Sequence, residues 1–281
     1  MKKVILSIIM VLIWIGVAHP ITAFGWTFAS TYNCSEWVCC TTISCDGWLK
    51  HGDWHSSGGG YEQITTAANY SAGGGGRGQR HWLGPGNADN SGGIRLDFAD
   101  VPEIWVRFYV RFQTGFSWAV FNLYYKLIYI NVAENPYFEC DWPRGFDYAG
   151  ICINGRDHLS PAGAGWDQVM VGGALDVNGH RTSDGQWHCF EYHLKTNTSG
   201  ANGVWEMWVD GVRLVNLTDM DFLGGNFNRV LFGSNHTPTL NPGDMYVDYD
   251  DIVISNTGYI GPIGGNPGSP PSSPKNLRIS P

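Results

Sequence analysis

The sequence has few charged residues and no excess of positive ones. Only 15% of its 281 residues are Asp, Glu, Lys or Arg, and the formal net charge is −8. An acidic surface repels the phosphates of nucleic acids and the headgroups of anionic membranes. We therefore expect no nucleic-acid partner and no insertion of the folded chain into a membrane.

Motifs of several common enzyme classes are missing. No Gly-x-Ser-x-Gly nucleophile elbow occurs, and the glycine run that begins at Gly73 lacks the Lys-Ser/Thr ending of a phosphate-binding loop. No convincing amphipathic helix is present either. We therefore do not expect this chain to be an α/β serine hydrolase, a P-loop enzyme or a helical protein.

The one long apolar run lies at the N-terminus. Lys2 and Lys3 precede an almost wholly apolar stretch, residues 4–18, and Thr22-Ala23 offers a small-residue cleavage site. This order is typical of a secretory signal peptide, since the run is short for a membrane span. We expect residues 1–23 to be removed and the protein to be secreted or held at the cell surface. An uncleaved membrane anchor is the alternative.

Seven cysteines agree with an oxidising compartment. Four of them lie between residues 34 and 45, inside a segment, 24–60, that we expect to be a Cys-rich, loop-like region packed on the main domain. Disulfides are favoured over a zinc site, because the spacing is not that of a zinc knuckle. The odd count leaves at least one thiol outside intramolecular pairs, and the sequence does not assign the pairing.

Glycine and aromatic residues are abundant, and short alternating segments follow one another from residue 94. The 38 glycines and 14% of aromatic residues are typical of all-β folds with tight turns. Residues 103–112 show the alternation best, with apolar side chains at the even positions and mostly Trp, Arg and Tyr at the odd ones. Further strands are predicted at 94–98, 126–132, 168–171, 187–195, 204–210, 212–216, 229–233 and 246–254.

A chain with about ten strands and almost no helix must bury its sheets against each other. We predict an all-β fold, a two-sheet antiparallel jelly-roll sandwich, over residues 61–260. The Asp210-Gly211 pair predicts a tight hairpin between two strands. The glycine-rich stretch 72–95 is predicted to be irregular, and residues 261–281 are predicted to form a Pro-, Gly- and Ser-rich linker-like tail.

Four segments, in this order along the chain, resemble the concanavalin A-like lectin/glucanase superfamily. They are the strand 103–112, KLIYI at 126–130, the W-V-D-G hairpin at 208–211 and DYDDI at 248–252. Within that superfamily the layout is similar to that of the jelly-roll polysaccharide lyases that cleave alginate or glucuronan. The resemblance implies a concave sheet that holds a glycan chain. It implies no particular activity, because lectin-like and catalytic members share the fold.

A polyuronate lyase needs one group that neutralises the sugar carboxylate, a base for the α-proton and an acid for the leaving oxygen. Lys126 stands where the resemblance places a lyase lysine, and Arg107 could assist it. Tyr109 and Tyr124 are candidates for the proton transfers. A solvated strand face of Lys, Arg and Tyr is the alternative interpretation. A glycoside hydrolase is less favoured than a lyase, because no tight row of carboxylates occurs.

A glycan-binding surface is the leading hypothesis. Aromatic rings stack on sugar rings, while amides, acids and basic groups bind hydroxyls and carboxylates. The candidate residues are Arg80, His81, Trp82, Trp105, Arg111, Glu206 and Trp208. Core packing is the alternative for any single tryptophan.

Metal binding is a minor possibility. Asp248 and Asp250 could hold a structural calcium ion, although hydrogen bonding in a turn is the simpler interpretation. No other cofactor is required. The hypotheses are thus a secreted protein that binds a polysaccharide on a concave sheet, a lyase that cleaves a polyuronate by β-elimination, and a structural or adhesion module of the cell envelope. The sequence leaves open whether the protein is an enzyme, and it names neither the glycan nor the oligomeric state.

Overall fold

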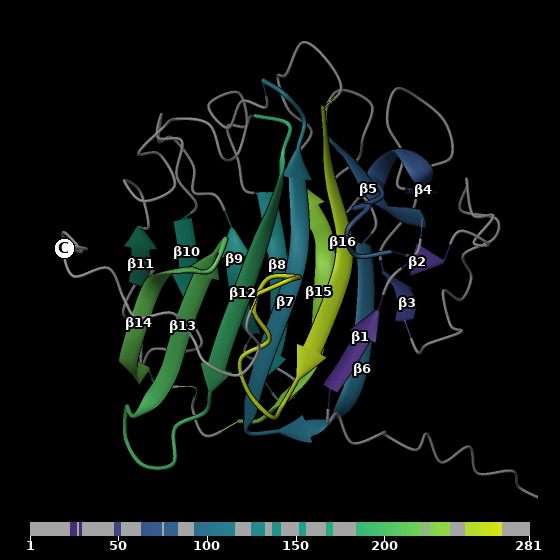
Figure 1. Ribbon diagram of the computed structural model, residues 1–281. Helices are drawn as coiled ribbons and strands as arrows, with labels where there is room; N and C mark the ends of the chain where they lie inside the picture. Colours follow the sequence, from purple (N-terminus) through teal and green to yellow (C-terminus); the bar gives the residue numbers. More distant parts are fainter. Residues whose placement is uncertain are drawn as a thin grey trace, which may run out of the picture.

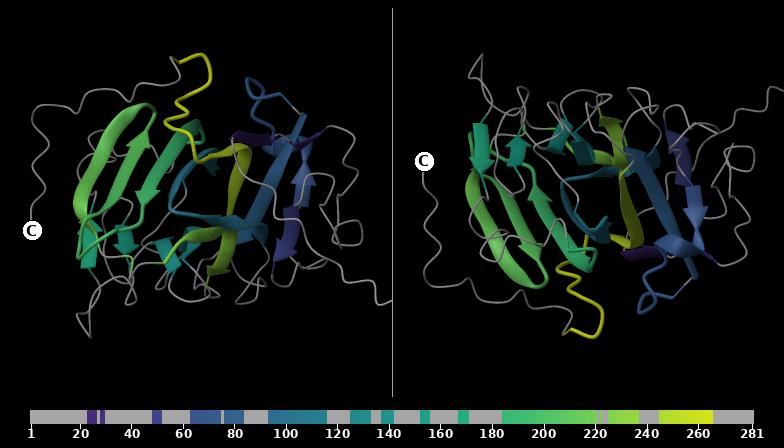
Figure 2. Two further views of the ribbon diagram at one scale, coloured as in Figure 1. Left: turned by 90° about the horizontal axis from the view of Figure 1, so that it is seen from below. Right: turned by 90° about the horizontal axis from the view of Figure 1, so that it is seen from above.

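The computed structural model contains two antiparallel β-sheets that pack face to face (Figures 1 and 2). The predicted all-β sandwich is therefore confirmed. The predictions for residues 1–22, for the cysteine cluster at 34–45, for Tyr124 and for the tail beyond residue 265 lie outside the described residues. The structure describes residues 23–26, 28–29, 48–51, 63–74, 76–83, 93–115, 125–132, 137–141, 152–155, 167–170, 184–220, 222, 225–236 and 245–265.

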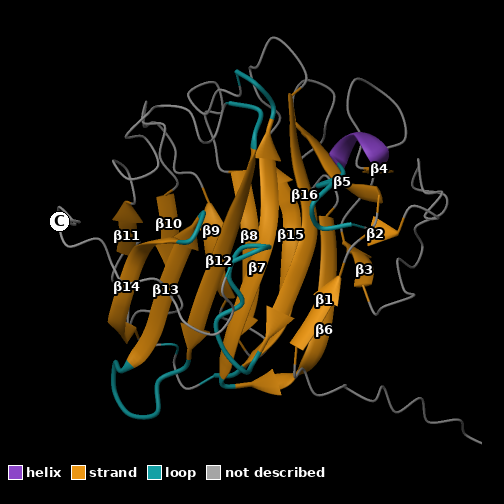
Figure 3. Cartoon of the chain, in the orientation of Figure 1, coloured by secondary structure: helices purple, strands orange, loops and turns teal. Residues whose placement is uncertain are grey.

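The nine-stranded sheet has the order β14-β13-β12-β7-β16-β5-β2, with β1 paired to β16 and β4 paired to β5. Its strands are β1 (Ala23–Trp26), β2 (Phe28–Ala29), β4 (Gln63–Thr65), β5 (Gly76–Leu83), β7 (Glu103–Phe112), β12 (Trp187–Lys195), β13 (Gly203–Val209), β14 (Val212–Met220) and β16 (Met245–Ser255). A short 3-10 turn, η2 (Thr66–Ala68), follows β4 and is purple in Figure 3.

The seven-stranded sheet has the order β11-β10-β9-β8-β15-β6-β3. Its strands are β3 (Trp48–His51), β6 (Gly93–Val101), β8 (Tyr125–Val132), β9 (Tyr137–Asp141), β10 (Cys152–Gly155), β11 (Asp167–Met170) and β15 (Phe227–His236). Each strand from 94 to 254 that the sequence predicts has a counterpart within a few residues. The strands that the sequence analysis missed are the short or glycine-rich ones, β1 to β5, together with β9 and β10.

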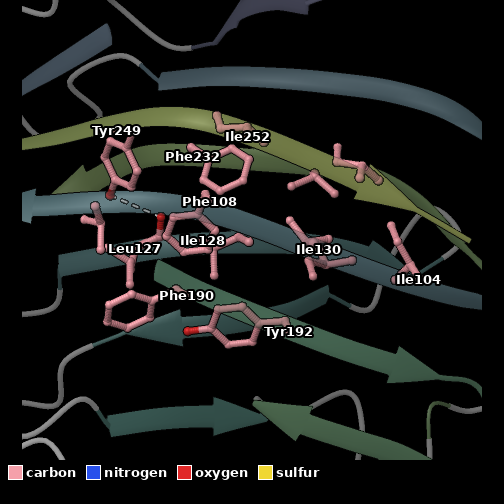
Figure 4. Packing of buried hydrophobic residues seen from close by; sticks show 14 of the residues in the cluster. Ile104, Phe108, Leu127, Ile128, Ile130, Phe190, Tyr192, Phe232, Tyr249 and Ile252 are labelled. Atoms are coloured by element: carbon pink, nitrogen blue, oxygen red, sulfur yellow. Dashed lines mark hydrogen bonds between the residues drawn. The ribbon is translucent and has the colours of Figure 1, made fainter. Parts of the chain in front are cut away.

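Alternating side chains of the two sheets fill the space between them (Figure 4). In β7 the even positions are at most 1% exposed, as the alternation predicts. They are Ile104, Val106, Phe108, Val110 and Phe112. The two layers are also joined by a hydrogen bond of 3.2 Å, which the Tyr249 hydroxyl in β16 donates to the Leu127 carbonyl in β8.

The predicted hairpin between β13 and β14 is present. Asp210 and Gly211 both have positive φ angles, 51° and 78°, which is the conformation that a tight two-residue hairpin requires. The Asp210 side chain also accepts a hydrogen bond of 2.9 Å from the backbone N–H of Cys189 in β12. The turn is therefore fixed both by backbone conformation and by a contact to the neighbouring strand.

The prediction of an irregular chain at residues 72–95 was wrong in part, because β5 runs through this stretch. The reason is visible at Gly78. A Cβ atom at this position would lie only 1.9 Å from the Ala68 carbonyl oxygen and 2.8 Å from the Tyr249 carbonyl oxygen. Gly78 is thus a strand residue that lacks a side chain so that the backbone of η2 can lie directly on β5.

Replacing Gly78 by alanine is expected to lower the free energy of unfolding by about 2 kcal/mol, since the new methyl group would push η2 off β5. Urea unfolding measures this loss. Gly74→Ala is the matched control, because Gly74 has a φ of 91° but no atom within 4 Å of the added Cβ, so this change costs only backbone strain, about 1 kcal/mol. Equal losses in the two variants would show that the contact between η2 and β5 is not tight.

Candidate functional site

The outer face of the nine-stranded sheet carries most of the predicted site residues. Each of these strands turns its alternate side chains away from the core, and the register aligns these outward positions across neighbouring strands. The predicted residues that share this face are Arg80, Trp82, Trp105, Arg107, Tyr109, Arg111, Glu206, Trp208, Asp248 and Asp250. The candidate site therefore has to be sought on this face.

Two predicted residues lie elsewhere. His81 points between the sheets and is fully buried, because it alternates with Arg80 and Trp82 in β5. Lys126 belongs to β8 in the seven-stranded sheet, whereas Arg107 and Tyr109 belong to β7 in the other sheet. The structure thus does not bring Lys126 together with Arg107 and Tyr109 on one sheet face, and Tyr124 lies outside the described residues.

A first segment, residues 66–74, covers part of this outer face. The ring of Tyr70 stacks on the ring of Tyr109 with 3.9 Å between their centroids. The backbone N–H of Tyr70 donates a hydrogen bond of 2.6 Å to Asp250 Oδ2. Tyr109 is consequently buried, and this burial raises the pKa of its hydroxyl well above the ordinary value.

A second segment, residues 256–265, crosses the same face and is named the C-terminal strap here. Figure 3 shows it as the loop that follows β16, in front of β7 and β12. The backbone N–H groups of Ile260 and Gly261 donate to Glu191, at 2.7 and 2.8 Å, and that of Ile263 donates to the Tyr109 hydroxyl at 2.8 Å. The strap is therefore held by the side chains of β7 and β12.

The strap covers Trp208, which points outward from the sheet. Its ring packs against Tyr259 of the strap, with 5.2 Å between centroids, and it is 1% exposed. Arg107 is buried as well, at 4% exposure, and its Nη2 lies 3.3 Å from Asp251 Oδ2. Trp208, Arg107 and Tyr109 face outward from the sheet as predicted, but in this structure the chain itself fills the space above them.

At one end of this face a row of side chains crosses four adjacent strands, and the side chains of Arg80 and Arg111 in it are 12% and 21% exposed. Trp187 in β12, Arg111 in β7, Asp248 in β16 and Arg80 in β5 lie directly opposite one another in the register. Asp248 is fully buried and accepts hydrogen bonds from Arg80 Nε at 2.7 Å and from Arg111 Nε at 3.0 Å. Both arginines also donate through Nη2 to the Ala67 carbonyl. Asp248 thus fixes two guanidinium groups side by side.

Aromatic rings flank these guanidinium groups. The Cζ atom of Arg80 lies 3.5 Å from the ring centroid of Tyr246 and 5.5 Å from that of Trp82, and the Cζ atom of Arg111 lies 4.8 Å from that of Trp187. These contacts are of the cation–π type. We name these six residues, Arg80, Arg111, Asp248, Trp82, Trp187 and Tyr246, the arginine–aromatic row. Within the described residues, Arg111 Nη1 makes no hydrogen bond, so a ligand could accept one from it.

The opposite end of the face carries a closed network. The two ring nitrogens of His193 lie 2.7 Å from Glu206 Oε2 and 2.9 Å from Glu103 Oε1, and Trp105 stacks on the imidazole at 4.1 Å. Arg213 Nη1 donates to Glu206 Oε1 at 2.6 Å. The hydrogen bonds from His193 and Arg213 lower the pKa of Glu206. Glu206 therefore has protein partners on both of its carboxylate oxygens.

Asp248 and Asp250 bind protein donors rather than standing together as ligands for a cation. Asp248 is held by two arginines, and Asp250 accepts hydrogen bonds from the backbone N–H groups of Tyr70 and Asp251. Within the described ranges, no group of three or more His, Cys, Asp or Glu side chains is arranged to hold a metal ion. No helix in the described part of the chain is long and apolar enough to cross a membrane.

Cys189 is the one cysteine whose side chain the structure describes. It is free and buried against Tyr109, and burial raises its pKa to about 12. A thiol with so high a pKa is not a nucleophile at neutral pH. The six other cysteines lie outside the described side chains, so the predicted disulfides stay a prediction.

Sequence analysis missed three residues of the site, Tyr70, Trp187 and Tyr246. Trp187 and Tyr246 could have been predicted, since each is the first residue of a predicted strand and alternates with residues of the core. Tyr70 lies in a turn without any periodic pattern, and its contact with Tyr109 joins positions far apart in the sequence.

Comparisons with known proteins agree with this fold. No protein-family model and no curated protein matches the sequence. Among solved structures, the chain is similar to a mutant of the alginate lyase Aly36B in complex with an alginate trisaccharide, with a TM-score of 0.57 and 14% identity over 84% of this chain and 98% of that one. It is also similar to the alginate lyase vAL-1 from Chlorella virus, with a TM-score of 0.52 and 11% identity over 80% of this chain and 99% of that one. The protein therefore has a two-sheet jelly-roll fold whose layout is similar to that of these two alginate lyases.

Proposed function

We propose that the protein binds an acidic polysaccharide through the arginine–aromatic row. The observation that carries the proposal is Arg111, whose guanidinium is held by the buried Asp248 while Nη1 makes no hydrogen bond within the described residues. A uronic acid carboxylate is a suitable acceptor for this group, because charge-assisted hydrogen bonds to arginine are short and strong.

The other residues of the row offer aromatic and charged contacts to a sugar ring. Trp82 and Trp187 are half-buried aromatic rings at the two sides of the arginines, and such rings pack well against the apolar faces of sugars. Two arginines around one aspartate leave the row with a net positive charge, although the chain as a whole is acidic. This local charge favours a polyuronate over a neutral glycan.

The similarity to alginate lyases and the apolar N-terminal run support the same proposal. Both alginate lyases share the fold, and one was solved with an acidic oligosaccharide bound. The N-terminal pattern supports export, which would place the protein where polysaccharides are found. A lyase would add β-elimination to the same recognition. It is distinguished by the ultraviolet absorbance of the new double bond when the protein is incubated with alginate, glucuronan or pectate.

Replacing Trp82 by alanine is expected to weaken binding of a polyuronate about tenfold, which corresponds to about 1.4 kcal/mol for a lost ring contact. Isothermal titration calorimetry with alginate, glucuronan, pectate and a neutral glucan measures the affinities. We expect binding to at least one of the three acidic polymers and none to the neutral glucan.

The matched control for this change is Trp105→Ala. Trp105 is also half-buried on the outer face of the same sheet, but it lies in the closed network with His193 at the other end. This control is expected to leave the affinity unchanged. Equal losses in both variants, or no heat with any acidic polymer, would contradict the proposal.

A further inference from the structure

We infer that the C-terminal strap is a displaceable cover over a second binding subsite for an acidic polysaccharide. The subsite consists of Trp208 in β13, Glu191 in β12 and Arg107 in β7, which lie directly opposite one another in the register. We name these three residues the covered row. The inference rests on the proposed function and adds to it a way in which the chain regulates its own binding of the glycan.

The covered row has the same kinds of side chain as the arginine–aromatic row. Both rows combine a guanidinium, a carboxylate and a tryptophan ring on the outer face of the nine-stranded sheet. Arg107 and Arg111 lie on the same side of β7, four residues apart, which is a separation of about 13 Å in an extended strand. A uronate chain that is held at Arg111 and runs along β7 would therefore meet a second arginine at the covered row.

The surface between the two rows is aromatic. The half-buried ring of Tyr70 stacks on Tyr109, which lies midway between the two arginines on β7, and the centroid of the Tyr70 ring is 5.7 Å from that of Trp187. Aromatic rings pack well against the apolar faces of sugars. A glycan that crosses from one row to the other would thus pass over Tyr70.

The docked strap leaves two buried donors of the covered row without an acceptor. Trp208 Nε1 and Arg107 Nε make no hydrogen bond within the described residues, although these side chains are only 1% and 4% exposed. The strap brings further donors, the N–H groups of Ile260 and Gly261, to Glu191. A buried donor without an acceptor is costly, so the strap satisfies the covered row only in part. A uronic acid offers carboxylate and hydroxyl oxygens as acceptors for both donors, and its hydroxyls can donate to Glu191.

The strap is held mainly by polar contacts of its backbone. Three N–H groups donate to side chains of β7 and β12, and the ring of Tyr259 packs on Trp208. Ile263 is 39% exposed and adds little apolar burial. Near the two ends of the strap, Gly258 and Gly264 have φ angles of 147° and 78°, and no other part of the described chain lies within 4 Å of where a Cβ atom would stand. Glycine tolerates large changes of backbone angle, so the strap can turn away from the sheet at these two positions.

Displacement of the strap by a glycan follows from these contacts. While the strap is docked, it occupies Glu191 and Trp208, and the first contact of the glycan is with the arginine–aromatic row. A polysaccharide bound there holds its next sugars close to the covered row, where their effective concentration is high. The docked strap lowers the apparent affinity in proportion to the fraction of molecules in which the covered row is open.

Hydrogen exchange of the strap in the unmodified protein tests the inference. The backbone amides of residues 259–263 are followed by mass spectrometry, without polymer and with saturating alginate, pectate or glucuronan. We expect about tenfold faster exchange with a polymer that binds in calorimetry, because the N–H groups of Ile260, Gly261 and Ile263 lose their acceptors when the strap leaves. A neutral glucan at the same mass concentration is the control and is expected to leave the exchange unchanged.

Tyr259→Ala is a second test, because it removes the ring that packs on Trp208. The affinity for the same polymer is expected to rise about fivefold, since the covered row would be open in more molecules. Ile263→Ala is the matched control in the strap, because its side chain is exposed and the change keeps the N–H that binds the Tyr109 hydroxyl. This control is expected to leave the affinity unchanged.

The possible outcomes separate this inference from the proposed function. Unchanged or slower exchange of the strap with a polymer that binds would overturn the displaceable cover and leave glycan binding at the arginine–aromatic row in place. An affinity of Tyr259→Ala that does not exceed that of Ile263→Ala would have the same meaning. Absence of heat with all three acidic polymers would overturn both proposals together.

Discussion

Replacing Asp248 by asparagine is expected to lower the free energy of unfolding by about 3–5 kcal/mol. The side chain is fully buried and is the acceptor shared by Arg80 and Arg111. Removing one member of a buried ion pair leaves the other charge without compensation, which costs several kcal/mol, about 3–5 in comparable cases. Asparagine keeps the size of the side chain, so the loss reports on charge. Equilibrium unfolding in urea measures it.

Asp97→Asn is the matched control on the seven-stranded sheet. Asp97 also lies between two arginines, with an oxygen 3.4 Å from Arg95 and a close contact to Arg229, but its side chain is 37% exposed. Exposed ion pairs contribute little because water screens them, so the expected loss is at most about 1 kcal/mol. Equal losses in the two variants would show that burial does not determine the strength of the arginine pairs.

The stability of the protein is expected to fall as the pH rises from about 4.5 to about 7, because of Glu191. Burial raises the pKa of Glu191 from 4.5 to about 7, against the opposite effects of the strap N–H groups of Ile260 and Gly261 and of Arg107. A carboxyl group with a higher pKa in the folded state binds its proton more tightly there. The stabilisation by Glu191 is therefore complete below pH 4.5, its pKa in the unfolded state. It is lost as the pH rises to about 7, its pKa in the folded state, and the loss in the free energy of unfolding is about 3 kcal/mol.

Glu191→Gln is expected to remove this pH dependence, since glutamine stays neutral and its amide oxygen can still accept a hydrogen bond from the strap. Urea unfolding at several pH values between 4 and 8 measures the difference. The control is Glu206→Gln on the neighbouring strand β13. The pKa of Glu206 is lowered by His193 and Arg213, so its contribution is present above its ordinary pKa and is lost as the pH falls. If the free energy of unfolding changed with pH in the same way in the original protein and in Glu191→Gln, the raised pKa of Glu191 would be contradicted.

The regular strands could be predicted because their alternation is a local property of the chain. In β7 every second residue is apolar and packs in the core, and residues 190, 192 and 194 of β12 repeat this pattern, whereas in β16 the alternation shifts by one residue at Asp251. The strand β5 could not be predicted in this way. Its glycines indicate turns in most sequences, whereas Gly78 is there because the carbonyl of Ala68 approaches the strand. That approach depends on tertiary packing, which no local pattern records.

From the sequence, only the sheet face that carries the candidate site could be predicted, and not which of its side chains are exposed. Alternation shows that Trp208 and Arg107 point away from the core, and the structure agrees. Whether an outward side chain meets water or protein depends on segments without periodicity, namely Tyr70 and the strap residues Tyr259 and Ile263. The sequence therefore could not separate the accessible Arg111 from the covered Arg107, four positions earlier on the same strand.

The most direct test of the proposed site is a crystal structure of the protein with an acidic trisaccharide. The account predicts a sugar carboxylate oxygen about 2.7–2.9 Å from Arg111 Nη1 and a sugar ring against Trp82 or Trp187. An oligosaccharide bound beside Trp105 and His193, or on the seven-stranded sheet, with the arginine–aromatic row empty, would contradict it.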